Sequence, residues 1–532
     1  MRFLVRKIEK QPYIILLQCY FILSIIFFIR SFNFPLHDFA VGYFAGQLID
    51  VGKLSSSLLY DIVKYNEYIW MQGFNNVYVD FYINSPFVAS FFYPVSALFE
   101  PYESKIVFNF LSVIVFAYSI YNLFKTEQIN KIYILIFPFI FITAIKNNIL
   151  FGQMYLLLTA FLIQGYIAFK KDKNLLGALY WSTVIYLKIF PILLLPYLLF
   201  KRKWRALIVL LVCLFSIGIF SVYLNGIEIW TTFLFDILPN TKQNGTYINY
   251  AVNAQSIIVY LKFLFQYDSH FNPNAYYNNI LIGKSLYFII QIIIIAFTLQ
   301  ISITKRSNDF ALFGCWLLFA LLVQPRMVSY TKILFIIPFL VVIKNANNKW
   351  QIIFSIIAIA IAVNFSPKWL SRFSLIFQWP VLYFLIIFSI LFYSIFVNRL
   401  NSKVLLFAIL IALPPFITVF VGKKQIDYSS YVLSSKRHFC IYDYYIKDEK
   451  LTYNYLSING KEFQNTDIDV FAIRYTDVVI DKNQIVYKGK QLTQSNDLKI
   501  KPSVINEKEI IYLSDKNSRR QAYTLRKLKI PD

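Results

Sequence analysis

The stretch "ILFGQMYLLLTAFLIQGYIAFKKDKNLLGALYWSTVIYLKIFPILLLPYLLFKRKWRAL", residues 149–207, decides the fold class of this chain. It consists of long apolar runs that are separated by short links rich in Lys and Arg. An apolar run of about 18 residues or more can cross about 30 Å of hydrocarbon as a helix. Such runs recur along most of the chain, which predicts an all-α polytopic membrane protein. A membrane β-barrel would instead show alternating segments of about ten residues.

The composition of the whole chain agrees with this class. Of its 532 residues, 58% are hydrophobic and 15% are charged, whereas ordinary soluble domains carry roughly a quarter charged residues. The net charge of +24 would also suit nucleic acid. However, Lys and Arg gather in the short links at 201–205, 304–309, 344–350 and 398–403. This is the pattern of cytoplasmic loops, so we expect the lipid bilayer as a partner and no nucleic acid.

The apolar runs predict about twelve to fourteen membrane helices within residues 1–422. The first is expected at 12–31 as a retained span with a cytoplasmic N-terminus, because its apolar part is too long for a cleaved signal. We expect outer loops at 32–84 and 225–283. The predicted location is the plasma (inner) membrane.

Simple alternation of the helices across the membrane fails between residues 85 and 200. A second span is expected to begin near "NSPF" at 84–87, and the links "FKTEQINK" and "FKKDKN" both have the charge of cytoplasmic loops. One element is therefore expected to be a half-span or a broken helix. The Pro-interrupted run at 174–200 is the first candidate.

The last part of the chain differs in character from the rest. Runs such as "HFCIYDYYI", "NQIVYKGKQL" and "EIIYLSD" are short, β-rich and separated by polar turns. They predict a small soluble β-containing domain over residues 423–532. It is expected on the extracytoplasmic side, and nothing in it indicates catalysis.

Polar residues within or beside apolar runs are costly, and each therefore marks a candidate site. His37 and Asp38 directly follow the predicted first span, where Asp38 suits either helix capping or chemistry. Gln153 lies at an apolar helix start, beside a glycine that suits close packing. Lys188 is the only charge in a long apolar run, where it either snorkels to the interface or holds a lipid-linked phosphate.

A fourth candidate is the outer turn "LVQPRMVSYTK", with Arg326, Tyr330 and Lys332. Arginine at a membrane surface commonly contacts lipid headgroups, and it also forms bidentate pairs with phosphate. None of these motifs is specific by itself.

Taken together and in order, the motifs resemble glycosyltransferase family 87, a branch of the GT-C membrane glycosyltransferases. The resemblance covers residues from about 10 to 400 and depends on the order and spacing of its segments. These are "HDFAVGYFAGQLIDVGKLSSSLLYD", "INSPFVASFFYPVSALF", the stretch at 149–207, "YAVNAQSI" and "QPRMVSYTKILFIIPFL".

The resemblance implies an enzyme that takes a hexose, usually mannose, from a polyprenyl-phosphate donor. It passes the sugar with inversion to a lipid or glycan acceptor on the outer face of the membrane. GT-C enzymes place a catalytic Asp early in the first outer loop, and Asp38 matches it as the general base, with His37 beside it. No metal and no cofactor other than the donor substrate is expected.

The candidate residues for binding the donor phosphate and the substrates come from all the matching segments. They are Lys188, Arg326, Tyr330, Lys332, Gln153, Asn253 and Gln255. The chain departs from the family pattern at Tyr330, because some members have a histidine at this place. The help that such a histidine gives would have to come from another residue.

Three alternatives remain open from the sequence. A transporter or flippase for lipid-linked saccharides would also place Lys and Arg near a midplane site, but it predicts paired repeats, which we do not find. A membrane glycan polymerase or ligase shares the class of donor. An inactive scaffold would use the β-rich tail as its working part.

Overall fold

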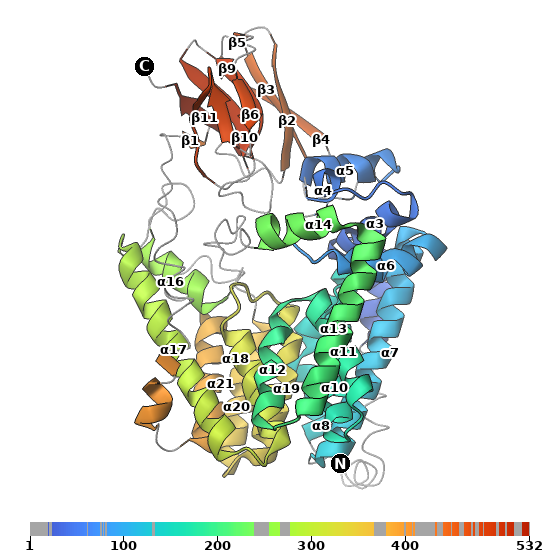
Figure 1. Ribbon diagram of the computed structural model, residues 1–532, viewed down its shortest axis with the longest axis vertical. Coiled ribbons are helices and arrows are strands. Elements are labelled where there is room, and N and C mark those ends of the chain that lie inside the picture. The colour runs from blue at the N-terminus through green and yellow to red at the C-terminus, as the bar shows by residue number, and fades with distance from the viewer. Residues whose placement is uncertain are drawn as a thin grey trace.

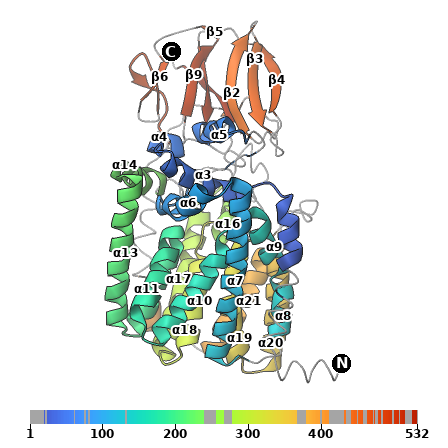
Figure 2. The same ribbon diagram turned by 90° about the vertical axis from the view of Figure 1, so that its right-hand side faces the viewer.

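A computed structural model shows an upright helix bundle with a β region beyond one of its ends (Figures 1 and 2). The structure describes residues 20, 24–238, 255–266, 277–365, 379–397 and 401–409, with gaps at 61, 75–76, 78, 80–81, 130–132 and 407, and most of the strands within 431–530. The predicted spans at 12–31 and near 402–421 therefore lie largely outside the described residues.

Helices make up most of the described chain, which confirms the predicted helical class. The first group is α3 (Asp38–Asp50), α4 (Ser56–Leu59), α5 (Ile62–Met71), α6 (Phe87–Leu98), α7 (Pro101–Glu127), α8 (Tyr133–Ile140), α9 (Ile142–Phe151), α10 (Tyr155–Lys170), α11 (Asn174–Leu187), η1 (Phe190–Leu194) and α12 (Leu195–Phe200). The second group is α13 (Trp204–Asn225), α14 (Ile227–Thr232), η2 (Phe233–Ile237), α16 (Ile257–Phe265), α17 (Ile280–Thr304), α18 (Asp309–Leu322), η4 (Thr331–Phe335), α19 (Ile336–Asn345), α20 (Lys349–Asn364) and α21 (Pro380–Phe396).

Several of these helices have the length and composition of membrane spans. Among the described residues, α7, α13 and α17 are long and apolar enough to cross a membrane, and a fourth span results if the bent pair α9 and α10 counts as one. Six further apolar segments are shorter, with 10–17 residues. The described helices therefore support a membrane protein, while the total of twelve to fourteen spans stays a prediction.

Helix α6 is shorter than the membrane span predicted near "NSPF". This helix has 12 residues, which gives a length of about 18 Å and is too short to cross the hydrocarbon. It packs against α3, and both views show the two helices at the upper end of the upright bundle (Figures 1 and 2). The second span predicted near "NSPF" is thus a short helix at one end of the bundle, and α7 is the first helix after it that is long and apolar enough to cross a membrane.

The close packing of α3 and α6 depends on glycine. A Cβ atom at Gly46 would lie only 2.7 Å from a backbone carbon of Phe92, so a larger residue would force the two helices apart. The apolar side chains Phe87, Val88 and Phe92 of α6 are consequently buried within the protein. An apolar run that covers another helix looks like a membrane span in the sequence, because both have the same hydropathy.

The basic links meet at the end of the bundle opposite to α3. Glu127, at the end of α7, accepts hydrogen bonds from Lys170 (2.6 Å) and Lys344 (2.7 Å). Lys203 pairs with Asp172 at 2.8 Å. The links that follow α7, α10, α12 and α19 therefore share one end of the bundle, as the charge pattern predicted.

The β region consists of antiparallel sheets, which confirms the prediction of a small C-terminal β-rich part. Both views show it beyond α4 and α5, at the end of the bundle that carries α3 (Figures 1 and 2). One sheet has the strand order β1-β11-β10-β9-β5, and two three-stranded sheets have the orders β2-β3-β4 and β6-β7-β8. The strands are β1 (Tyr431–Val432), β2 (Cys440–Lys447), β3 (Lys450–Leu456), β4 (Glu462–Asp469), β5 (Ala472–Ile473), β6 (Val478–Asp481), β7 (Gln484–Tyr487), β8 (Lys490–Gln491), β9 (Lys499–Ile505), β10 (Glu509–Ser514) and β11 (Thr524–Lys529).

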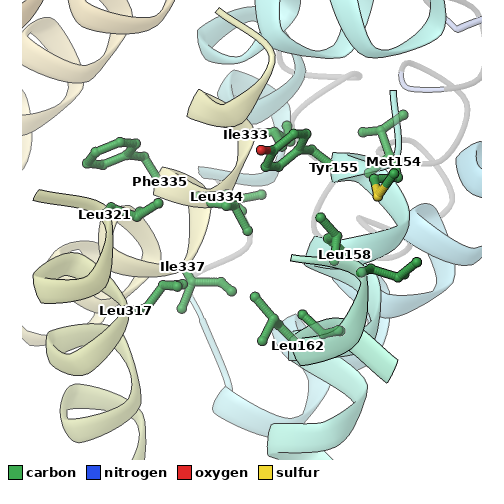
Figure 3. Close-up of a cluster of buried hydrophobic side chains, with 14 of the residues drawn as sticks. Met154, Tyr155, Leu158, Leu162, Leu317, Leu321, Ile333, Leu334, Phe335 and Ile337 are labelled. Carbon is green, nitrogen blue, oxygen red and sulfur yellow. The ribbon is translucent and has the colours of Figure 1, made fainter. Parts of the chain in front are cut away.

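The interior of the bundle is apolar between α10, α18 and the segment formed by η4 and α19. Figure 3 shows Leu158 and Leu162 of α10 facing Leu317 of α18 and Leu334 of η4. All four side chains are buried, and burying one leucine side chain is worth about 1.5–3 kcal/mol. This packing fixes the start of α10, where the candidate site lies.

Candidate active site

Asp38 lies at the start of α3, directly after a tight turn. The Phe39 N–H donates to the Leu36 carbonyl at 3.2 Å, and His37 between them has φ 52° and ψ −134°. These angles place His37 at the first central position of a type II′ turn, where glycine is normally required. A histidine in such a conformation costs of order 1–3 kcal/mol, and strain of this kind is concentrated at functional sites.

The capping interpretation of Asp38 is not what the structure shows. The N-cap residue of α3 is His37, and no side-chain hydrogen bond caps this helix. Asp38 is the first helical residue, so its negative charge is favoured by the N-terminal end of the helix dipole. Its carboxylate is directed to other partners instead, which leaves a chemical role open.

Two side chains hold the Asp38 carboxylate. His37 Nδ1 lies 2.9 Å from Oδ1, and the Gln153 amide donates a hydrogen bond of 2.6 Å to Oδ2. The imidazole ring of His37 in turn stacks on Phe151, with 4.2 Å between the ring centroids. The Asp38 side chain is 25% exposed, so it is held in place by these two partners and still accessible.

Gln153 reaches Asp38 because the chain turns sharply between α9 and α10, which meet at 116°. Gly152 forms this bend with a left-handed backbone conformation, with φ 64°. A Cβ atom at this position would lie 2.6 Å from the Cβ atom of Phe39, so glycine is needed for both its conformation and its size. The sequence "LFGQ" therefore brings the Gln153 amide to the start of α3.

The surroundings of Asp38 act in opposite directions on its pKa. Burial is the largest effect and would raise the pKa of the Asp38 carboxyl. The charge of His37, the hydrogen bonds from His37 and Gln153 and the charge of Lys188 outweigh it, so that the pKa lies below its ordinary value. The carboxylate is thus ionised at neutral pH and able to accept a proton.

Lys188 lies where the apolar run at 174–200 breaks. Helix α11 ends at Leu187, Lys188 adopts an extended conformation, and η1 follows with Pro191 in its first turn. The Lys188 ammonium donates a hydrogen bond of 2.7 Å to the side-chain oxygen of Asn84. It is also close enough to Asp38 and Arg326 to interact electrostatically with both. The predicted break is confirmed, and its lysine faces the Asp38 region.

The turn at 325–330 docks on the same region. Asn148 of α9 donates to the Tyr330 carbonyl at 3.0 Å, and Asn147 donates to the Ser329 hydroxyl at 2.7 Å. The Tyr330 ring lies edge-on to Phe151, with 6.2 Å between the ring centroids. Tyr330 therefore packs beside the aromatic ring that supports His37.

Two of the predicted substrate contacts have other partners in the structure, and a third lies outside the described residues. The Lys332 ammonium is buried and donates to the Ala362 carbonyl of α20 at 3.0 Å. The Gln255 side-chain oxygen accepts a hydrogen bond of 3.2 Å from the Leu382 N–H of α21. Asn253 lies outside the described residues.

Sequence reasoning missed Lys105 of α7. Its side chain is 1% exposed, and its ammonium donates to the carbonyls of Pro35 and Leu150 at 2.7 Å each. It thus joins the turn before Asp38 to the end of α9. The sequence carried a signal for it, because Lys105 is a charged residue beside a long apolar run. Lys188 was identified on the same ground.

Chemically, the site joins one accessible carboxylate to a group of cations and aromatic rings. The carboxylate can accept a proton from a hydroxyl. Lys188 and Arg326 can balance the negative charge of a phosphate. The combination suits a reaction in which a hydroxyl is activated close to an anionic leaving group.

Comparison with known proteins agrees with this chemistry. The model of glycosyltransferase family 87 matches residues 82–325. This is the family that the sequence motifs indicated, and the match points to a membrane glycosyltransferase. No curated protein and no solved structure matches the chain. Lys188 and Gln153 lie within the matched residues, whereas Asp38 and Arg326 lie outside them.

Proposed function

We propose that the protein transfers a hexose, with mannose as the expected sugar, from a polyprenyl-phosphate donor to a hydroxyl of a lipid or glycan acceptor. The reaction takes place at the end of the bundle that carries α3, which is assigned to the extracytoplasmic face of the plasma membrane. The basic links at the opposite end support this assignment, because such links stay in the cytoplasm.

In the proposed reaction, Asp38 is the general base. The acceptor hydroxyl oxygen attacks the anomeric carbon while its proton passes to the Asp38 carboxylate. The bond between the anomeric carbon and the phosphate oxygen breaks, and both of its electrons leave with the polyprenyl phosphate. Attack from the side opposite to the leaving group inverts the configuration at this carbon.

Lys188 and Arg326 are assigned to the phosphate. The leaving group is a phosphate monoester, which is stable as an anion and needs no strong general acid. Cations placed beforehand stabilise the negative charge that develops on it. No metal ion is part of this proposal.

One observation carries the proposal: the Asp38 carboxylate, held at 2.6 Å by Gln153, lies close enough to Lys188 for the two charges to interact. A base for the acceptor and a cation for the donor phosphate thus adjoin each other at a break in the apolar bundle. A transporter or flippase needs a cation near lipid phosphate, but it does not need an accessible carboxylate held in one orientation.

The test compares two aspartates of the same helix. A strain that lacks the protein is complemented with the wild type, Asp38→Asn or Asp50→Asn, and its glycolipids are analysed by mass spectrometry. Asp50 is exposed at the far end of α3, so its variant should restore the missing glycolipid. Asp38→Asn should leave it unmade although the protein accumulates to the normal level in the membrane. Full restoration of the glycolipid by Asp38→Asn would refute the assignment of Asp38 as the general base and favour a transporter or flippase.

A further inference from the structure

Tyr155 is the first residue of α10 and follows the bend that carries Gln153. Its side chain is 8% exposed. The ring lies 5.5 Å from the Tyr330 ring between centroids, and the Lys188 ammonium lies 5.8 Å from the Tyr155 ring centroid. Figure 3 shows Tyr155 projecting from α10 towards η4, at the upper edge of the apolar cluster.

The hydroxyl group of Tyr155 takes part in none of the hydrogen bonds found among the described residues. The hydroxyl oxygen is also absent from the fully buried unpaired polar atoms of the described residues, so it keeps some access to solvent and is open to a ligand. The ring of Tyr155 lies beside the Lys188 ammonium, and its hydroxyl is close enough to Asp38 to interact with it electrostatically. This hydroxyl is therefore a hydrogen-bonding group within the candidate site.

The neighbours of the Tyr155 hydroxyl indicate which ligand atom suits it. Lys188 and Arg326 have only donor groups, so neither can accept a hydrogen bond from the phenol. The Asp38 carboxylate accepts from Gln153 and lies against His37, and the Tyr155 phenol is not among its hydrogen-bond donors. An anionic ligand oxygen beside Lys188 would accept the phenolic hydrogen and be attracted by both cations.

We propose that the Tyr155 hydroxyl donates a hydrogen bond to the phosphate of the lipid-linked donor, at the oxygen that departs from the anomeric carbon. This inference rests on the proposed function, and it adds a residue that binds the leaving group. As the bond between the anomeric carbon and this oxygen breaks, the electron pair stays on the oxygen. The neutral phenol keeps its proton and stabilises the developing charge, as a donor placed in advance does in an oxyanion hole.

The experiment measures binding of the product-like probe farnesyl phosphate to the purified full-length protein, with farnesol as the uncharged reference. The variants are Tyr155→Phe and Tyr166→Phe. Tyr166 lies on the same helix but donates to Glu127 at the opposite end of the bundle, at 2.7 Å. We expect Tyr155→Phe to bind farnesyl phosphate about 10- to 100-fold more weakly, which is the range for a hydrogen bond to a charged group. Its affinity for farnesol should not change.

Thermal unfolding of the same samples separates binding from folding. Tyr155→Phe removes a hydroxyl that has no hydrogen-bond partner among the described residues, so its Tm should equal or exceed that of the wild type. Wild-type affinity of Tyr155→Phe for farnesyl phosphate would overturn the role of Tyr155 and leave the proposed function in place. A wild-type protein that does not prefer farnesyl phosphate to farnesol would overturn both the donor class and the role of Tyr155.

Discussion

The side-chain amide nitrogen of Gln153 lies 2.6 Å from a carboxylate oxygen of Asp38, although 115 positions separate the two residues. This contact joins the start of α3 to the bend between α9 and α10. It also contributes to the low pKa of Asp38, together with His37 and Lys188.

The first prediction concerns the pH dependence of activity. A base acts above its pKa, and its contribution is lost as the pH falls through that value. Gln153→Leu removes a hydrogen bond that favours the charged form, which raises the pKa of Asp38. The acid limb of kcat/KM should therefore move to higher pH, as measured in the purified enzyme between pH 4 and 8.

The matched control for this experiment is Gln164→Leu. Gln164 lies on the same helix, α10, but donates to Ser119 at 3.0 Å. Its variant should keep the acid limb of the wild type. An unchanged limb in Gln153→Leu would contradict the assignment of that limb to Asp38.

A second prediction separates the two interpretations of Lys188. Lys188→Met keeps the apolar stem and removes the charge. If the ammonium holds the donor phosphate, KM for the donor should rise about 10- to 100-fold, the range for a lost charged hydrogen bond. KM for the acceptor should change little. Steady-state kinetics with each substrate varied in turn provide the measurement.

Lys203→Met serves as the control, because Lys203 pairs with Asp172 at the opposite end of the bundle. If Lys188→Met and this control have the same KM for the donor, Lys188 does not bind the donor phosphate. The interpretation of Lys188 as a lysine that snorkels to the membrane interface would then hold.

The sequence predicted the helical class and the common end of the basic links, because hydropathy and charge are read residue by residue. It misassigned α6, since "FVASFFYPVSALF" is as apolar as a membrane span. Hydropathy does not distinguish a helix that contacts lipid from one that packs on α3. The glycines of α3 that allow this packing show their role only when both helices are in place.

The candidate site was predicted in part for a related reason. Asp38, Gln153 and Lys188 were each found by residue type, but their proximity depends on tertiary contacts across more than a hundred positions. Lys332 has the same residue type and a similar setting, yet its ammonium is bound by a carbonyl of α20. Residue type identifies a group that is able to bind phosphate, and only the fold decides whether it faces the site.

A third prediction concerns Lys105, which we assign to positioning. Lys105→Met would remove the donor from the carbonyls of Pro35 and Leu150. Pro35 is exposed, but the carbonyl of the buried Leu150 would be left unpaired at a cost of about 1–3 kcal/mol. The Tm should fall by several degrees, and kcat should fall because the turn that carries His37 is released. Lys125→Met, an exposed position on the same helix, should change neither. Wild-type Tm and kcat in Lys105→Met would show that its two hydrogen bonds do not support the turn.

The last prediction tests whether the bend between α9 and α10 places the catalytic group. Gly152 and Gly52 have the same φ of 64°, but a Cβ atom at Gly52 would meet nothing within 4 Å. An alanine in this conformation costs about 1–2 kcal/mol at either position. In Gly152→Ala the new methyl group would also collide with Phe39, the neighbour of Asp38, at 2.6 Å.

Both variants should therefore lose some thermal stability, and Gly152→Ala should lose more. The difference in kcat is the decisive measurement, because only the collision at Phe39 moves the start of α3. We expect Gly52→Ala to keep the wild-type kcat and Gly152→Ala to lose at least tenfold, since a displacement of about 1 Å in a catalytic group can cost about a hundredfold in rate. Equal values of kcat in the two variants would mean that the position of the Asp38 carboxylate does not depend on the contact between Gly152 and Phe39.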